Sequence, residues 1–193
     1  MSKKIFLDVE TTGFDGQLHG IIQIAGIIEI DGETKKTFDL PVNVFEDDEI
    51  NQSALAVNKK TLEQIAEFPD PQDVHKILTD TMGEFVNRYK PKDKFSFIGY
   101  NASFDMNFMR QWFKKLGDKY FGSWFWFPYI DVMTMAADYL VDHRAELDDF
   151  KLGTVAAYLG IEWDKDTDLH DALTDIVLTR GIYEVITKEA SNG

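Results

Sequence analysis

The feature that most constrains the fold is a β-branched run at 21–30, which the pair Asp31-Gly32 follows immediately. β-branched residues favour strands, and an Asp-Gly pair favours a tight hairpin turn. A strand is therefore predicted at 21–30, joined by a hairpin to a third strand at 37–42. The alternating residues at 4–9 predict the first strand. The chain should thus begin with three strands connected by hairpins.

The rest of the chain alternates between strands and helices. A strand predicted at 95–100 leads directly into a helix at 102–116, and a strand at 127–130 leads into a helix at 132–140. This order predicts an α/β fold with a mixed five-stranded sheet flanked by helices. Right-handed crossovers should make the later strands parallel to the first. Further helices are predicted at 61–68, 73–89, 152–159 and 171–188.

Length and composition predict one globular domain over 1–190, with 191–193 as a frayed tail. The chain has 193 residues, 44% of them hydrophobic, and no Pro/Gly/Ser-rich stretch marks a linker. It has no cysteine, which excludes disulfides and thiolate metal sites. No run approaches the ~20 apolar residues that cross a bilayer. We therefore expect a soluble cytoplasmic protein without a membrane partner.

The net charge of −14 argues against tight binding to long duplex nucleic acid. Proteins that bind nucleic acid non-specifically usually carry a basic surface, which releases phosphate counterions. Carboxylates can nevertheless act on phosphodiesters when divalent cations lie between them and the substrate. The net charge therefore does not exclude catalysis at the end of a short strand.

Asp8 and Glu10 lie two residues apart on the first predicted strand, so their side chains should point to the same face. Two like charges side by side raise each other's pKa unless a cation lies between them. The pair alone is weak evidence for a site, because a solvated strand edge explains it equally well.

Asp105 lies in the first turn of the helix at 102–116, at the head of an apolar stripe, and Asn101 is expected to cap that helix. A first-turn acid favoured by the helix dipole explains Asp105 as well as a functional role does. Asp175 lies on the small-residue stripe of the last helix, which should face the sheet. Burying an unpaired Asp there is costly, which favours a partner or a metal ion. His170 should lie on the loop before that helix, where an exposed histidine of no special role is the simpler explanation.

Taken together, these residues form a set of four carboxylates and one histidine, each at a strand end or near a helix start. Oxygen ligands suit hard divalent ions. Two such ions ~4 Å apart can activate water and neutralise a phosphodiester. A histidine with a pKa near neutrality can accept the proton from that water. The set is Asp8, Glu10, Asp105, Asp175 and His170.

Three segments resemble the motifs of the DnaQ-like (DEDDh) 3′→5′ exonucleases. Residues 8–13, DVETTG, are similar to the first motif, and residues 101–105, NASFD, to the second. Residues 170–175, HDALTD, are similar to the third motif in the form that carries histidine. The motifs follow the family's order, and the likeness spans nearly the whole chain.

The resemblance implies an RNase H-like fold and a two-ion mechanism with Mg²⁺ or Mn²⁺. The substrate would be the 3′ end of single-stranded DNA or RNA, and the products nucleoside 5′-monophosphates. Asp8 would bridge both ions, and Glu10 and Asp175 would bind the ion that holds the attacking water. Asp105 would bind the other ion, and His170 would be the general base.

The resemblance also implies contacts with the terminal nucleotide, through backbone N–H groups and an aromatic ring that stacks on the base. Plain core packing remains an alternative for the two phenylalanines. The implied substrate-binding residues are Thr11, Thr12, Gly13, Phe14, Asn101 and Phe104.

Several residues outside the three motifs have more than one interpretation from the sequence alone. Gln23 stands where many relatives have Glu, at a position that is not a metal ligand. The aromatic run at 120–127 favours a core or subunit contact over base stacking, which leaves a homodimer open. Asp131 is expected to cap a helix. The pairs Lys59-Lys60 and Lys114-Lys115 could hold phosphates or lie on solvated helix faces.

The chain stops soon after the third motif, without a polymerase domain or a clear replicase-docking tail. This favours a stand-alone trimming enzyme, like RNase T or a phage-type exonuclease. Two alternatives are a non-catalytic binding or scaffold module and an oligoribonuclease-like enzyme for short RNA. The first is disfavoured because all five site positions are filled, and the second by the Thr11-Thr12 form of the first motif.

Overall fold

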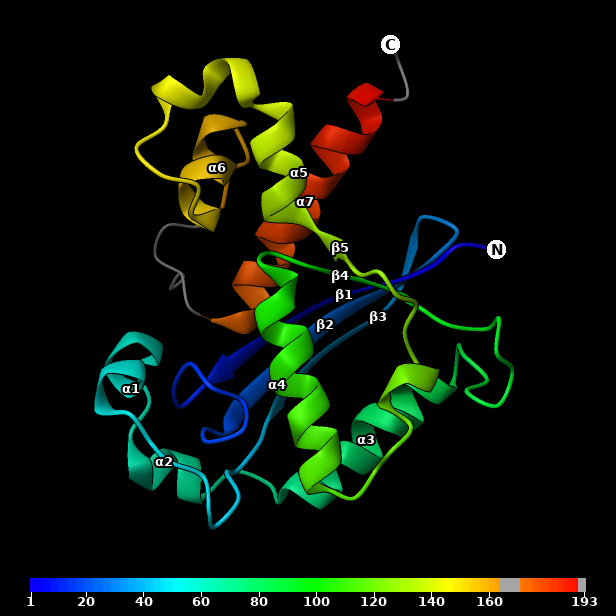
Figure 1. Ribbon diagram of the computed structural model, residues 1–193, viewed down its shortest axis with the longest axis vertical. Coiled ribbons are helices and arrows are strands. Elements are labelled where there is room, and N and C mark those ends of the chain that lie inside the picture. The colour runs from blue at the N-terminus through cyan, green and yellow to red at the C-terminus, as the bar shows by residue number, and fades with distance from the viewer. Residues whose placement is uncertain (164–170, 191–193) are drawn as a thin grey trace.

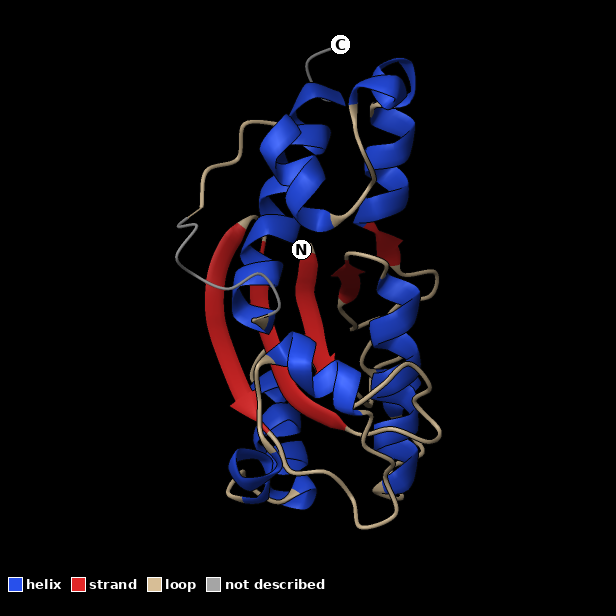
Figure 2. Ribbon diagram, turned by 90° about the vertical axis from the view of Figure 1, so that its left-hand side faces the viewer, coloured by secondary structure: helices blue, strands red, loops and turns tan. Residues whose placement is uncertain are grey.

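The computed structural model describes residues 1–163 and 171–190, and its centre is a twisted five-stranded sheet (Figures 1 and 2). The strand order is β3-β2-β1-β4-β5. β1 is antiparallel to β2, as β2 is to β3, whereas β1 and β4, and β4 and β5, are parallel. The predicted mixed sheet is therefore confirmed. The strands are β1 (Lys3–Thr11), β2 (Ile21–Ile30), β3 (Glu33–Pro41), β4 (Ser96–Gly99) and β5 (Ile130–Asp131).

Helices cover both faces of the sheet (Figure 2). One face packs against α3 and α4 and forms the α4-side core, which contains Leu78, Phe108 and Trp112. The opposite face packs against α5, α6 and α7 and forms the α7-side core, which contains Val155 and Ile182. The helices are α1 (Gln52–Asn58), α2 (Leu62–Ala66), α3 (Pro71–Gly83), α4 (Ala102–Lys115), α5 (Val132–Tyr139), α6 (Leu152–Tyr158) and α7 (Ala172–Ala190).

β1 supplies both cores because alternate side chains of a strand point to opposite faces. Ile5, Leu7 and Val9 lie in the α4-side core, whereas Phe6 lies in the α7-side core. Asp8 is two residues beyond Phe6 and so shares the face that α7 covers. The alternation thus directs the acidic residues of β1 towards α7.

Several elements differ from the sequence-based expectation, among them β3, which was predicted at 37–42 but begins at Glu33. The helix predicted at 73–89 begins at Pro71 and ends at Gly83, a poor helix former, and the chain then turns while Val86 remains in the core. The strand predicted at 127–130 is reduced to Ile130–Asp131, because Pro128 has no N–H to donate to a ladder. Helix α1 was not predicted; its start is marked by Asn51, whose side chain accepts from Ser53 N–H.

The aromatic run at 120–127 divides between the core and the surface, so the expected core contact holds for half of its aromatic residues. Phe121, Trp124 and Phe125 are buried in the α4-side core, whereas Tyr120 and Phe127 are exposed. In the part of the chain that the structure describes, no helix is both long and apolar enough to cross a bilayer.

Candidate active site

Three carboxylates meet where the C-terminal end of β1 passes the first turn of α7. Asp8 and Glu10 lie opposite Ala25 and Gln23 of β2, and the register shifts directly after Glu10. Asp175 lies in the first turn of α7, where the helix dipole favours a negative charge. One ligand oxygen each from Asp8, Glu10 and Asp175 lies within 4.8 Å of the other two. Residues far apart in the chain therefore form one acidic cluster.

Asp105 approaches the same strand from α4 and is only 2% exposed. Its Oδ1 accepts a hydrogen bond from Val9 N–H at 3.1 Å. This N–H is available because the pairing of β1 with β4 ends at Phe6. At the end of β4, Gly99 leaves room for the turn into α4, since a Cβ there would lie 3.3 Å from Asp105 Oδ2. Asp105 is thus tied to the strand that carries Asp8 and Glu10.

The electrostatics of the cluster favour a cation. Burial, followed by the charges of Asp105 and Glu10, raises the pKa of Asp8 well above its ordinary value. Burial, followed by the charges of Asp175 and Asp105, raises the pKa of Glu10 to about 8. Burial also raises the pKa of Asp105 to about 8, although the hydrogen bond from Val9 N–H opposes the change. Crowded, buried carboxyl groups of this kind fit hard divalent ions, which prefer oxygen ligands and compensate the negative charge.

The predicted nucleotide-binding loop leaves β1 at Thr11. Thr12 is fully buried, and its hydroxyl donates to Glu49 O at 2.7 Å and accepts from Gly20 N–H at 2.9 Å. Gly13 cannot be replaced by a larger residue without moving His19, whose imidazole occupies the space of a Cβ. Phe14 is 77% exposed, so core packing does not account for it. The loop is therefore held by its own contacts while an aromatic ring remains accessible.

Two residues next to this loop were missed in the sequence. Asn58, the last residue of α1, donates from Nδ2 to Thr11 O at 2.9 Å. The positive charge of Lys60 lowers the pKa of Glu10 against the stronger opposing effects, which places Lys60 within electrostatic reach of the cluster. In the sequence, the Lys59-Lys60 pair was the one indication of a positive charge near the site. No local pattern predicts that α1 packs beside β1. Of the second pair, Lys115 forms an ion pair with Asp48, so a solvated helix face does not describe it.

The second motif region differs from expectation at one position. Asn101 does precede α4, but its backbone is left-handed (φ 58°), and its side chain makes no capping hydrogen bond. Asn101 thus occupies the predicted N-cap position without the expected side-chain hydrogen bond, and an Asn tolerates the sharp turn between β4 and α4 that this conformation provides. Phe104 is partly buried, with its ring centroid 4.7 Å from that of Phe108. The predicted cap at Asp131 is confirmed, since its Oδ1 accepts from Thr134 N–H at 3.0 Å.

The start of α7 is fastened to the sheet. Gln23 Nε2 donates to Asp171 Oδ1 at 3.1 Å and to Asp39 Oδ1 at 2.8 Å. The other carboxylate oxygen of Asp171 accepts from Thr174 N–H at 3.2 Å. His170, the expected general base, lies outside the described residues, as does the expected tail at 191–193.

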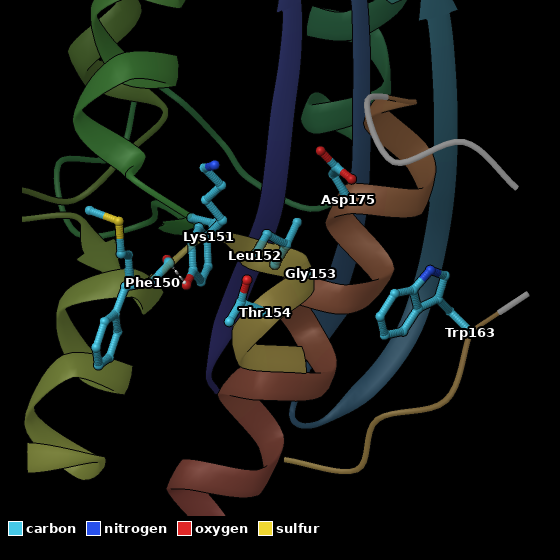
Figure 3. A pocket seen from close by; sticks show the side chains of 9 residues that line it. Phe150, Lys151, Leu152, Gly153, Thr154, Trp163 and Asp175 are labelled. Carbon is cyan, nitrogen blue, oxygen red and sulfur yellow. Dashed lines mark hydrogen bonds between the residues drawn. The ribbon is translucent and has the colours of Figure 1, made fainter. Parts of the chain in front are cut away.

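A pocket of about 750 Å³ adjoins the acidic cluster on the side of α6, and Figure 3 shows the residues around it. Asp175 belongs to both the pocket and the cluster. We call this cavity the α6 pocket. Its lining includes Tyr100, Lys151, Leu152, Thr154, Trp163 and Asp175.

The chain has curated relatives among bacterial proteins named DNA polymerase III PolC-type. It is 26% identical over 190 residues to a DNA polymerase III PolC-type of Oceanobacillus iheyensis, and 25% identical over 179 residues to that of Thermotoga petrophila. These alignments cover 97% and 93% of this chain but only 12% and 11% of the relatives. The chain thus corresponds to about an eighth of the length of the curated relatives it matches.

Solved structures with the same fold include two exonucleases. Exonuclease I of E. coli, in complex with a dT13 oligonucleotide, has a TM-score of 0.75 and 20% identity, over 96% of this chain and 41% of that one. The nuclease domain of 3′hExo, a DEDDh family member bound to rAMP, has a TM-score of 0.74 and 18% identity, over 97% of this chain and 92% of that one. Exonuclease I has also been crystallised with a zinc ion. The predicted RNase H-like fold is confirmed.

Residues 5–183 match the RNase_T family, whose description is exonuclease. This range spans all three motifs and nearly every described element. The chain therefore belongs to the RNase_T exonuclease family, and its fold is that of the DnaQ-like, RNase H-like nucleases.

Proposed function

We propose that this protein is a 3′→5′ exonuclease that releases nucleoside 5′-monophosphates from single-stranded nucleic acid with the help of two divalent ions. The observation that carries the proposal is the acidic cluster itself. Asp8, Glu10 and Asp175 bring ligand oxygens within 4.8 Å of one another in a buried setting, where like charges are costly without a cation. An inert scaffold gains nothing from this arrangement.

The four carboxylates are the ligands that we assign to the ions, with Mg²⁺ or Mn²⁺ as the metal. Asp8 occupies the central position, because Asp105, Glu10 and Asp175 all raise its pKa. Asp8 would accordingly contact both ions, Glu10 and Asp175 one of them, and Asp105 the other. When bound, the ions supply positive charge to the phosphodiester and lower the pKa of water at the site.

His170 is proposed as the general base. It directly precedes Asp171 in the sequence, and the Asp171 carboxylate accepts a hydrogen bond from Gln23 of β2. A histidine titrates near neutral pH and can accept the proton of the attacking water. Replacing it with Ala should lower kcat by ~10²–10⁴-fold.

The terminal nucleotide is proposed to bind on the side of the β1–β2 loop. Phe14 offers an exposed ring for stacking, and Phe104 lies at the start of α4. Backbone N–H groups of Thr11, Thr12 and Gly13 are the proposed partners of the terminal sugar, with Asn101 nearby at the scissile end. The side chain of Thr12 is already engaged within the loop, so its role would be through the backbone.

The substrate class rests on the structural neighbours. Exonuclease I is bound to single-stranded DNA oligonucleotides, and a 3′-exonuclease recognises a histone mRNA stem-loop. We propose a single-stranded 3′ end, of DNA or RNA, as the substrate in the cytoplasm. Because the relatives are DNA polymerase III PolC-type proteins, editing of a growing DNA strand is one setting that we propose for this activity, and trimming of free 3′ ends is the other.

The test is digestion of matched single-stranded DNA, single-stranded RNA and duplex, each labelled at the 5′ end, with Mg²⁺ or Mn²⁺. Removal from the 3′ end should give a ladder of shortening labelled products, whereas attack from the 5′ end would release a labelled mononucleotide at once. Asp8→Ala and Asp175→Ala should each lower the rate at least ~10³-fold, because each removes a charge from the proposed ion site.

Asp73→Ala is the matched control, since Asp73 is an exposed acid in the first turn of α3. It should retain the wild-type rate. Undiminished turnover in Asp8→Ala or Asp175→Ala would remove these carboxylates from the mechanism. Absence of any ladder with wild-type protein would contradict the proposed activity.

A further inference from the structure

The α6 pocket and the nucleotide-binding loop lie on opposite sides of the acidic cluster. In Figure 1, α6 lies above the start of α7, and the connection between β1 and β2 lies below it. Asp175 lines the α6 pocket, whereas Phe14 belongs to the loop on the other side. A strand with its terminal nucleotide at the loop would therefore extend across the cluster towards α6.

We propose that the α6 pocket binds the base of the penultimate nucleotide, whose 3′ oxygen is the leaving group of the reaction. This inference rests on the proposed function, and it assigns a substrate position to residues that none of the three motifs contains except Asp175. Because Asp175 is shared by the cluster and the pocket, a ligand in the pocket is adjacent to the phosphodiester that the cluster would cleave.

The α6 pocket is large enough to admit a nucleobase, and its lining suits an aromatic ring. Its volume of about 750 Å³ lies within the ~300–1,000 Å³ of small-molecule sites, which are mostly apolar with a few polar groups. Tyr100, Leu152 and Trp163 provide the aromatic and aliphatic surface. The Tyr100 hydroxyl donates to Phe150 O at 2.6 Å, which fixes the tyrosine ring at the wall of the pocket.

The polar groups of the α6 pocket argue for stacking rather than for base-specific hydrogen bonds. The hydroxyl of Thr154 is already committed to Asp149 Oδ1 at 2.7 Å. Lys151 is paired with Asp149 at 3.1 Å, but its side chain is 83% exposed, so its ammonium can approach a phosphate of the strand. Stacking on aromatic side chains is tolerant of base identity. The pocket should accordingly accept all four bases with similar affinity.

The experiment compares two substrates that carry different leaving groups at the scissile bond. One is a single-stranded DNA octamer, and the other is the methyl ester of thymidine 5′-monophosphate, which has one nucleotide and a leaving group, methanol, that cannot stack on an aromatic ring. Trp163→Ala should raise KM for the octamer about tenfold, as expected when one base loses an aromatic stacking partner. The ratio of octamer to ester hydrolysis, compared as kcat/KM, should fall by the same factor.

Trp163→Phe keeps an aromatic ring and should restore most of the ratio. Trp126→Ala is the matched control, because Trp126 is a partly exposed tryptophan outside both the pocket and the cluster, and its ratio should equal that of wild type. Binding of a fluorescent octamer, followed by anisotropy with Ca²⁺ in place of Mg²⁺, supplies a readout that does not depend on turnover. There Trp163→Ala should weaken binding about tenfold.

The two proposals can fail separately. An unchanged ratio and unchanged octamer binding in Trp163→Ala, with wild-type protein active on both substrates, would overturn the inference and leave the exonuclease proposal standing. If wild-type protein hydrolyses neither substrate but binds the octamer, and Trp163→Ala weakens that binding, the pocket assignment stands as a binding site and the proposed activity fails.

Discussion

The two faces of β1 differ although one backbone carries both. Ile5, Leu7 and Val9 are all apolar and buried in the α4-side core. On the opposite face Phe6 continues the α7-side core, but Asp8 and Glu10 then bring buried negative charge against α7. Neighbouring residues of one strand therefore differ in what they contribute: those on one face form the apolar core, and those on the other bring carboxyl groups together.

The difference shows where the fold gains its stability and where it gives some of it up. Burying an apolar side chain stabilises the folded state by ~1.5–3 kcal/mol, whereas burying a carboxylate without a counter-ion destabilises it. The α4 face of β1 should therefore be sensitive to loss of volume and insensitive to metal ions. On the α7 face, stability at Asp8 and Glu10 should instead depend on metal ions, and three predictions test that contrast.

The largest effect on stability is expected from Leu7→Ala, which creates a cavity in the α4-side core. Leu7 is fully buried, and such truncations cost ~2–5 kcal/mol. Urea unfolding should show this loss equally with and without Mg²⁺. Thr37→Ala on the exposed strand β3 is the control, with a change below ~0.5 kcal/mol. A loss in Leu7→Ala that Mg²⁺ largely reverses would erase the distinction between the two faces.

The second prediction concerns pH. In the unfolded chain Glu10 has its ordinary pKa of 4.5, and in the folded protein its pKa is about 8, so the folded state binds the proton more tightly. The corresponding stabilisation is complete below pH 4.5 and is lost as pH rises to about 8. The pKa of Asp105 is raised from 3.8 to about 8, so Asp105 also contributes stability at low pH that is lost as the pH rises over this interval.

Metal-free protein in EDTA should accordingly lose ~2–3 kcal/mol of unfolding free energy between pH 5 and pH 8, since one pKa unit corresponds to ~1.4 kcal/mol and the coupled groups titrate together. Saturating Mg²⁺ should flatten this slope, because the ions bind the ionised carboxylates. Stability that rises over the same interval in EDTA would show that the carboxyl groups are not buried together as described.

The smallest effect is expected from Asp8→Asn, which removes one negative charge with little change of shape. At pH 8 in EDTA this variant should be more stable than wild type by ~1 kcal/mol, because Asp8 is surrounded by Asp105, Glu10 and Asp175. The stabilisation of the protein by Mg²⁺, measured as the rise in Tm, should shrink in the same variant. A less stable variant in EDTA would mean that Asp8 has a compensating partner in the metal-free fold.

Local sequence patterns predicted most of the fold. The β-branched run before Asp31-Gly32 defined the hairpin, and alternation along β1 correctly placed Asp8 and Glu10 on one face. The errors arose where tertiary context decides. Val86 packs in the core without being helical, and the strand before α5 is short because Pro128 interrupts it.

The site was predictable to the extent that its motifs are local. Asp175 could be assigned to the site because burying an acidic side chain on a core-facing stripe is costly unless a partner or a metal ion compensates its charge. Asn58 and Lys60 could not, because their proximity to Thr11 and Glu10 depends on how α1 docks, which no spacing encodes. The left-handed backbone of Asn101 could not be predicted either, because an Asn before a helix is equally compatible with a side-chain cap.

The early end of the β1–β4 pairing has a mechanical consequence. One oxygen of Asp105 holds the backbone of Val9, the residue between Asp8 and Glu10, so α4 and the two acids of β1 share a single rigid linkage. A slide of α4 along the sheet would pull on the strand and change the spacing between ligands. A longer acid at this position, as in Asp105→Glu, would push the helix and the strand apart. The spacing of the carboxylates is therefore fixed by the way α4 packs on the sheet.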